Sequence, residues 1–301
     1  MTYRSTTRAF LDGNTRTLTY VVWDHATRRA AIIDPVLDFD LESGRIETTS
    51  ADRVLAYLAD HRLEVEWILE THAHADHVSS AQYLRACAGG RVAIGADIRI
   101  VQATFMKIYG LEPQFMADEA PFDHLFHDGE AFRIGGLAAT ALHVPGHTPA
   151  DMAYLVDGAV FVGDTLFMPD VGSARTDFPG GDARQLYQSI RRLLELPPDM
   201  VMYVCHDYPP AHRGSEWQTT VAEQRAANVH AHVGVSQDAF ATMRIARDAT
   251  LDTPRLFLPS IQINVLVGFL PHAGYDGVRY LRIPLAMPSW MRSGSMSAQM
   301  P

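Results

Sequence analysis

One short segment constrains this chain more than any other. It reads Thr71-His72-Ala73-His74-Ala75-Asp76-His77 and follows an apolar run, Val65–Leu69, that predicts a strand. Three imidazoles and a carboxylate so close together cannot all point into an apolar core, and both groups are usual ligands of first-row metals. Because residues two apart on extended backbone share a face, His72 and His74 can converge on one ion. The alternative is a solvated loop that is rich in histidine by chance, since the chain has 14 histidines.

Three other potential ligands stand at similar places in the chain. They are His147 in Val144-Pro145-Gly146-His147-Thr148, Asp164 in Phe161-Val162-Gly163-Asp164-Thr165, and His206 after Met200–Val204. Each follows an apolar run that predicts a strand. A single His or Asp in a turn is more often an ordinary turn residue. The repetition favours ligands, because loops from four strand ends that meet at one edge of a sheet would form a metal site.

Size and composition are those of an ordinary globular protein. The 301 residues, 47% of them hydrophobic, suffice to bury a core without disulfides or a structural metal, so a bound metal is available for chemistry. The net charge of −10 and the lack of a basic run argue against nucleic acid as a partner. No stretch approaches the roughly 20 apolar residues of a membrane span. Met1–Leu11 does not resemble a secretory signal, and two cysteines suit a reducing compartment, so we expect a cytoplasmic protein with no membrane partner.

The remaining pattern predicts one domain, residues 1–301, of mixed strands and helices. Strands are expected at Leu18–Trp23, Ala30–Ile33, Val65–Leu69, Ala131–Ile134, Leu137–Val144, Met152–Val156, Ala159–Val162 and Met200–Val204. Helices are expected at Ala51–Arg62, Val78–Ala88, Ile98–Tyr109, Asp182–Leu196 with Asp182 as its cap, Thr219–Asn228 and Gln237–Ala249. Leu256–Gly268 predicts a buried strand rather than a partner surface. Residues from about 219 to 292 form a C-terminal elaboration, and about 293–301 a disordered tail.

The order of these motifs resembles that of the metallo-β-lactamase superfamily. His-x-His-x-Asp-His, Gly-His, Gly-Asp and a late His follow the family's order between Leu18 and Tyr208. The resemblance implies an α+β fold, a four-layer αββα sandwich with its site at one edge between two sheets. In dinuclear members one metal would be held at the positions of His72, His74 and His147. The second would be held at those of Asp76, His77 and His206, with Asp164 as the bridge. All seven positions are filled, so the ligand set alone does not choose between subclasses.

Further segments favour oxygen chemistry. Ser173-Ala174-Arg175-Thr176-Asp177-Phe178 resembles the Gly-Arg-Thr-Asp-Phe segment of persulfide dioxygenases, although Ala174 replaces the usual glycine. Met243–Leu251 and Leu258–Asn264 are similar to the C-terminal region of the bacterial, β-lactamase-like members of that group, which is related to glyoxalase II. The resemblance implies one Fe(II) per chain, held by His72, His147 and Asp164. It also implies oxidation of a persulfide, expected to be glutathione persulfide, with O₂ and water to sulfite and the free thiol.

The resemblance also gives roles to other polar residues. His74, Asp76, His77 and His206 would surround the iron through hydrogen bonds, or would hold a second metal. The residues expected to act in catalysis are Asp76, His77, His206 and Arg175. Glutathione carries two carboxylates, so its site should offer donors, and the candidates are Arg175, Tyr208, Arg213 and Arg244. Each of these four alone is more often a salt-bridge partner or a surface residue.

Two other functions stay open from the sequence. One is a dinuclear zinc hydrolase, a glyoxalase II-like thioesterase acting on a glutathione thioester. The other is a binding or sensing protein that keeps the fold as a scaffold, against which the complete ligand set speaks. We expect a homodimer, and a sulfurtransferase (rhodanese) partner is compatible with the resemblance. Cys205 is expected to be a buried strand residue rather than a redox thiol, Cys87 a packing residue, and His124 and His127 solvated loop residues rather than a second metal site.

Overall fold

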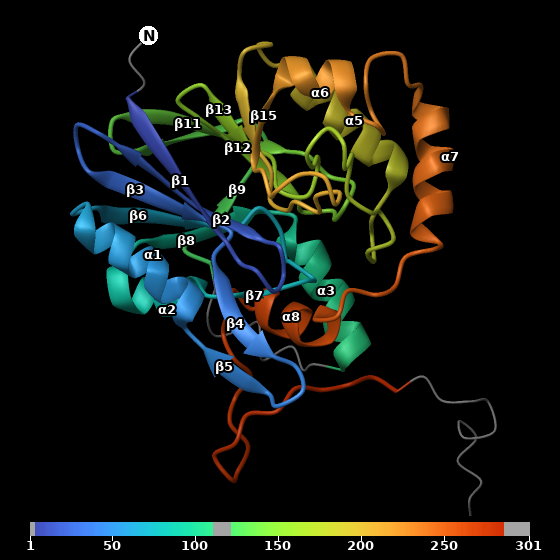
Figure 1. Cartoon of the computed structure of the whole chain (residues 1–301). Helices are drawn as coiled ribbons and strands as arrows, with labels where there is room; N and C mark the ends of the chain where they lie inside the picture. Colours follow the sequence, from blue (N-terminus) through green and yellow to red (C-terminus); the bar gives the residue numbers. More distant parts are fainter. Residues whose placement is uncertain (1–3, 111–121, 286–301) are drawn as a thin grey trace, which may run out of the picture.

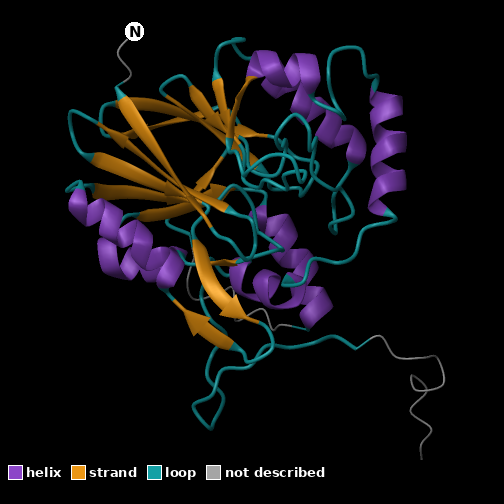
Figure 2. Cartoon of the chain, in the orientation of Figure 1, coloured by secondary structure: helices purple, strands orange, loops and turns teal. Residues whose placement is uncertain are grey.

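The protein folds as two sheets packed face to face between helices. The structure, a computed structural model, describes residues 4–110 and 122–285 (Figure 1). Helices cover the outer face of each sheet, which confirms the expected four-layer αββα sandwich (Figure 2). Within these described ranges, every helix is too short or too polar to cross a membrane. The predicted tail, about 293–301, and the end of the predicted elaboration lie outside the described residues.

Each sheet draws on one part of the chain. The first sheet has the strand order β1-β2-β3-β6-β8-β9 and the second β10-β11-β12-β13-β14-β15, while β5-β4-β7 form a small third sheet. The strands are β1 (Ser5–Leu11), β2 (Leu18–Asp24), β3 (Arg29–Ile33), β4 (Val36–Asp40), β5 (Arg45–Glu47), β6 (Glu64–Leu69), β7 (Val78–Ser79), β8 (Arg91–Gly95), β9 (His124–Phe126), β10 (Glu130–Ile134), β11 (Leu137–His143), β12 (Met152–Val156), β13 (Ala159–Phe161), β14 (Val201–Tyr203) and β15 (Gln218–Thr220). The helices are α1 (Thr49–Asp60), α2 (Ala81–Ala88), α3 (Ile98–Tyr109), α5 (Ala183–Leu194), α6 (Val221–Ala227), α7 (Gln237–Asp248) and α8 (Phe257–Asn264).

Strand β2 shows how the sequence produces the layers. Successive side chains of a strand point to opposite faces. Leu18, Tyr20 and Val22 therefore enter the core between the sheets, whereas Val21 and Trp23 pack in the core beneath α1. All seven residues of β2 are buried, which explains why this strand is largely apolar instead of alternating between apolar and polar residues.

The directions of three strands bring the functional loops together. Strands β11 and β13 both pair antiparallel with β12, so they run in the same direction, and β14 pairs parallel with β13. The carboxyl ends of all three strands therefore lie at the same edge of the second sheet. The loops that contain His147, Asp164 and His206 begin at this edge.

Three predicted elements differ from the structure. The helix expected at Val78–Ala88 begins only at Ala81, because Val78–Ser79 pair with β4 as β7. The helix expected at Thr219–Asn228 begins at Val221, because Gln218–Thr220 pair with β14. Leu256–Gly268 is not a strand: its centre is α8, which contacts α3 and β7. Six successive residues of α8 are buried, so this run lacks the periodicity that would identify a helix.

Other local predictions have mixed outcomes. Asp182 caps α5, because its carboxylate accepts hydrogen bonds from the backbone N–H groups of Arg184 and Gln185. Both cysteines are free, and Cys205 is buried as expected. Cys87 is exposed, so its predicted packing role is wrong; α2 packs through Ala81 and Leu84 instead.

The two histidines of the acidic segment after Pro121 also differ from each other. His127 is exposed, as predicted. His124 is not a loop residue but belongs to β9, where its Nε2 lies 2.6 Å from Glu130 Oε1. Pairing of β9 with β8 overrides the polar, turn-like composition of this segment.

Candidate metal centre

Seven His and Asp side chains from the two sheets meet at one edge of the sandwich. His72, His74, Asp76 and His77 follow β6, while His147, Asp164 and His206 follow β11, β13 and β14. Their ligand atoms form two groups, each with all atoms within 4.8 Å of one another: His72, His147 and Asp164, and His74, Asp76, His77 and His206. Asp164 lies between the groups, since its Oδ1 is 3.3 Å from His206 Nε2. The structure thus brings all the sequence-predicted ligands together.

The glycine before each of two ligands is required by the backbone. Gly146 has a φ of +144°, and a Cβ there would lie 2.3 Å from the Cα of Leu186 in α5. Gly163 has a φ of +53°, and a Cβ there would lie 2.8 Å from the Thr71 side chain. Only glycine tolerates both the conformation and the close approach. The Gly-His and Gly-Asp pairs of the sequence are therefore structural conditions for presenting His147 and Asp164.

Several buried polar atoms of this cluster have no hydrogen-bond partner among the described residues. They are His72 Nε2, His74 Nδ1, His77 Nε2 and His206 Nδ1, while His206 Nε2 and Asp164 Oδ1 have only the ion contacts of His206 with Asp76 and Asp164. Each such atom costs about 1–3 kcal/mol when buried and unsatisfied. Metal ions that accept these lone pairs would satisfy them together, because imidazole nitrogen and carboxylate oxygen are usual ligands. The residues present therefore fit a site for metal ions.

Hydrogen bonds on the far side of the rings orient two of the ligands. His147 Nδ1 donates to the backbone carbonyl of Arg175 at 2.8 Å, which leaves Nε2 free to face Asp164. Thr71 donates its hydroxyl to Asp34 at 3.0 Å, so its oxygen accepts from His72 Nδ1 at 3.0 Å. Such contacts fix the ring and the nitrogen that bears the lone pair.

Asp34 is a site residue that sequence reasoning missed. Its carboxylate accepts from the Thr71 backbone N–H at 2.7 Å and lies 3.0 Å from His74 Nε2. The residue is buried and has a φ of +50°, a strained conformation for a non-glycine residue. In the sequence, Asp34-Pro35 indicates only the end of a strand. The tertiary contacts that give Asp34 its role leave no local signal.

The electrostatics favour metal binding at His72 and Asp76, but favour a protonated imidazole at His74. Burial and the neighbouring histidines lower the pKa of His72 well below its usual value, which keeps its imidazole neutral. Burial opposes the ionisation of Asp76, but His206 and His77 outweigh burial and hold the pKa of this carboxyl below its usual value. For His74, burial lowers the pKa, but Asp34 and Glu70 outweigh burial and raise the pKa of this imidazole well above its usual value.

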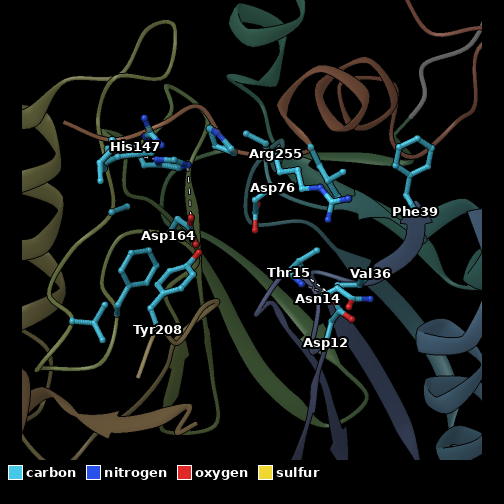
Figure 3. A pocket seen from close by; sticks show the side chains of 18 of the residues that line it. Asp12, Asn14, Thr15, Val36, Phe39, Asp76, His147, Asp164, Tyr208 and Arg255 are labelled. Carbon is cyan, nitrogen blue, oxygen red and sulfur yellow. Dashed lines mark hydrogen bonds and ion pairs between the residues drawn. The ribbon is translucent and has the colours of Figure 1, made fainter. Parts of the chain in front are cut away.

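A cavity of about 1020 Å³ opens over the cluster and is lined by Asp76, His147 and Asp164. Figure 3 shows His147, Asp164 and Tyr208 on one side and Phe39 of β4 on the other, with Asp76 between them. The volume is at the upper end of the range of about 300–1,000 Å³ that is usual for small-molecule sites. Tyr208 also lies over His206, with the ring centroids 5.8 Å apart and an interplanar angle of 15°. The cavity thus offers room for a sizeable ligand directly beside the buried ligand atoms.

Arg175 and Arg244 line this cavity but are already bound by the protein. Arg175 makes a bidentate ion pair with Asp177 at 2.6 Å and donates to the Asp252 carbonyl at 2.8 Å. Arg244 is buried and lies 2.6 Å from Asp248. Their guanidinium groups therefore hold loops in place. Ala174, which replaces the family's glycine, is not among the residues with positive φ, so this change has no backbone cost.

Arg213, the other predicted substrate arginine, is not among the residues that line the cavity. It forms ion pairs with Asp170 and with the fully buried Asp207, each at 2.7 Å. A different arginine, Arg247, lines the cavity, and its guanidinium has no hydrogen bond or ion pair to any described residue, although its backbone carbonyl accepts from Thr250. Arg247 was overlooked, although it lies within the segment Met243–Leu251.

Comparison with known proteins identifies the class. Residues 12–206 match the family described as the Metallo-beta-lactamase superfamily. The chain belongs to this superfamily and contains a cluster of metal-binding residues, consistent with a hydrolase or an oxygenase.

Individual relatives carry two kinds of name. Glyoxylase B2 of Dictyostelium discoideum is 49% identical over 88% of this chain and 91% of its own length. Persulfide dioxygenase ETHE1, mitochondrial, of Homo sapiens is 30% identical over 70% of each chain. The crystal structure of ETHE1 from Myxococcus xanthus is similar, with a TM-score of 0.70 and 29% sequence identity. The similarity covers 88% of this chain and 100% of the Myxococcus chain.

Proposed function

We propose that this protein is a persulfide dioxygenase that uses one Fe(II) held by His72, His147 and Asp164. The observation that supports it most directly is the grouping of two imidazoles and one carboxylate at the wall of a large cavity. Two histidines and one carboxylate with open positions are the ligand set of many non-haem iron oxygenases. The sequence and structural similarity to ETHE1 proteins supports the same activity.

The reaction uses one persulfide, one O₂ and one water, and yields the thiol, sulfite and two protons. Fe(II), when bound, would supply the binding positions for oxygen and the terminal sulfur. The chain's own residues supply position and proton transfer. The Arg175 carbonyl orients His147. His206 Nε2 lies 3.1 Å from Asp76 Oδ2, so this pair can accept the protons that the added water releases.

The substrate that we propose is glutathione persulfide. Its two carboxylates require cationic partners, and Arg247 is the cavity arginine with free donors among the described residues. The Tyr208 side chain lies on the wall beside the metal centre and can donate a hydrogen bond to the bound peptide (Figure 3). The cavity of about 1020 Å³, lined from Asp164 to Phe39, also has room for a tripeptide.

A second candidate is a dinuclear zinc hydrolase that acts on a glutathione thioester. One structural observation favours it: His74, Asp76, His77 and His206 form a second group of ligand atoms within 4.8 Å of one another. The similarity to a relative named Glyoxylase B2 points in the same direction. Two ions that share a hydroxide would suit hydrolysis.

One experiment separates the two functions. The protein is purified without oxygen, its iron and zinc per chain are measured, and O₂ uptake is followed with glutathione persulfide. The thioester S-lactoylglutathione is tested in parallel. We expect about one iron per chain, one O₂ consumed per persulfide, and sulfite as product. Two zinc ions per chain with thioester hydrolysis and no oxygen uptake would contradict the dioxygenase proposal and support the hydrolase.

A further inference from the structure

The segment Thr71–Ser79, here called the metal loop, is bound by a side chain from the far end of the sequence. Asn264, the last residue of α8, is only 4% exposed. Its Nδ2 donates to the backbone carbonyl of His74 at 2.8 Å and to that of His77 at 2.7 Å. Its Oδ1 accepts from the backbone N–H of Ser79 at 2.8 Å. One amide thus joins three backbone groups of the loop across a sequence distance of 185 to 190 residues.

Among the natural side chains of this shape, only an amide can make all three contacts. Asparagine provides two N–H donors and one carbonyl acceptor, and all three are used here. Aspartate has the same shape but lacks the donors, and leucine lacks both donors and acceptor. The loop carbonyls are buried with the histidines that bear them, so each lost hydrogen bond would leave an unsatisfied group.

The support behind Asn264 is rigid. Helix α8 is buried through Ile261 and Ile263, and the residues after it are held by two further amides. Gln102 of α3 donates to the Val265 carbonyl at 2.7 Å, and Gln82 of α2 donates to the Val267 carbonyl at 3.1 Å. The position of Asn264 is therefore held by the helices beside the first sheet and by the packing of α8 against β7.

We infer that Asn264 is a positioning residue that sets the spacing of the metal-loop histidines. Its Nδ2 binds the backbone carbonyls of both His74 and His77. The distance between these carbonyls is thereby fixed, and with it the spacing of the two imidazoles in the cluster. Asp34 holds the His74 ring from the other side, at 3.0 Å. The loop conformation is thereby set before any ion binds. This inference does not depend on the proposed dioxygenase activity, because it concerns metal affinity whether one ion or two are bound.

The chain offers a closely matched control on the same helix. Gln262 lies two residues before Asn264 and is also 4% exposed. Its Nε2 donates to the carbonyls of Leu258 and Arg282 at 2.8 Å each, and its Oε1 accepts from the Arg282 N–H at 2.8 Å. Gln262 thus makes the same three kinds of hydrogen bond to backbone, but none of them to the metal loop.

The test compares Asn264→Ala with Gln262→Ala in the full chain. Three quantities are measured: the melting temperature of the metal-free protein, the Kd for Co(II) by competition with a chelator, and the visible spectrum of the Co(II) form. We expect both variants to lower the melting temperature similarly. Asn264→Ala should raise the Kd by about 10- to 100-fold, the usual effect of losing a contact that orients ligands, and should alter the spectrum. Gln262→Ala should change the Kd less than about twofold and leave the spectrum as it was.

Wild-type Kd and spectrum in Asn264→Ala, or equal rises of the Kd in both variants, would overturn the inference. If Asn264→Ala does not fold, Asn264→Asp and Gln262→Glu are compared in the same way, since both substitutions keep the shape, remove the donors and add the same negative charge. Loss of Co(II) affinity confined to Asn264→Asp supports the inference. Equal affinities in that pair refute it. Neither result depends on whether the enzyme consumes oxygen or hydrolyses a thioester.

Discussion

The histidine cluster and the arginines around the cavity are opposite kinds of polar region. In the cluster, buried nitrogen and oxygen atoms point inward without partners among the described residues. Around the cavity, Arg175 and Arg244 are bound to carboxylates or carbonyls of the chain itself. Arg213, outside the cavity, is bound in the same way.

Whether a polar group already has a partner in the protein distinguishes a functional residue from a structural one better than the residue type does. A buried polar atom without a partner is costly, so it indicates a ligand that the protein is built to receive. A guanidinium that already has a carboxylate has few donors left for a substrate. Arg247 differs from both groups, because it lines the cavity as an exposed residue whose guanidinium has no partner in the described part of the chain and is free to bind a ligand. The following substitutions test the comparison.

The largest effect is expected from the three residues assigned to iron. Replacing His72, His147 or Asp164 by alanine should abolish iron binding and lower the activity by about 1,000-fold or more, because a metal supplies several kcal/mol of transition-state stabilisation. Iron per chain and oxygen uptake measure the result. His127→Ala, which changes an exposed histidine, should leave both unchanged. Full iron content in His147→Ala would show that this assignment is wrong.

The next effect concerns stability alone. Arg213→Ala should lower the free energy of unfolding by about 3 kcal/mol, because it leaves the buried carboxylate of Asp207 without its partner. Urea unfolding of the metal-free protein measures it. The KM for the persulfide should stay within about twofold of wild type. A large rise in KM with unchanged stability would show instead that Arg213 binds the substrate.

A smaller effect is expected at His206. His206→Ala should keep most of the iron and lower kcat by about 100-fold, since the pair with Asp76 would lose its proton acceptor. Metal content and kcat are measured on the same preparation. Loss of metal equal to that in His147→Ala would instead indicate a two-metal centre.

The smallest effect is expected at Arg247. Arg247→Ala should raise the KM by about tenfold, the value of one charge-assisted hydrogen bond of about 1.5 kcal/mol, without lowering kcat or stability. Arg255→Ala is the matched control, because Arg255 lines the same cavity but pairs with Glu42 at 2.7 Å. If both variants have the same KM, Arg247 does not bind the substrate.

The sequence predicts the metal cluster well because its signals are local. Each ligand follows an apolar strand, and glycine precedes both His147 and Asp164 for reasons of backbone geometry. The arginines could not be assigned in this way, because a guanidinium binds a nearby carboxylate of the chain, such as Asp248 four residues after Arg244, as readily as it binds the carboxylate of a substrate.

The fold shows the same limit. Helix α8 is buried on all sides and therefore resembles a buried strand in sequence. Asp34 and Asn264 act through contacts with residues far along the chain, so neither shows a periodicity or a motif that marks its role.

The hydrogen bonds from Asn264 also connect His74 and His77 to a part of the chain that is translated after them. Domains begin to fold while the chain is still being made, from the N-terminus onward. All seven cluster residues have been translated once His206 is added, but α8 follows more than 50 residues later. Until then the loop of His74 and His77 has no amide to hold its carbonyls. On the inference drawn for Asn264, full metal affinity is therefore reached only after α8 has been translated and has folded against the loop.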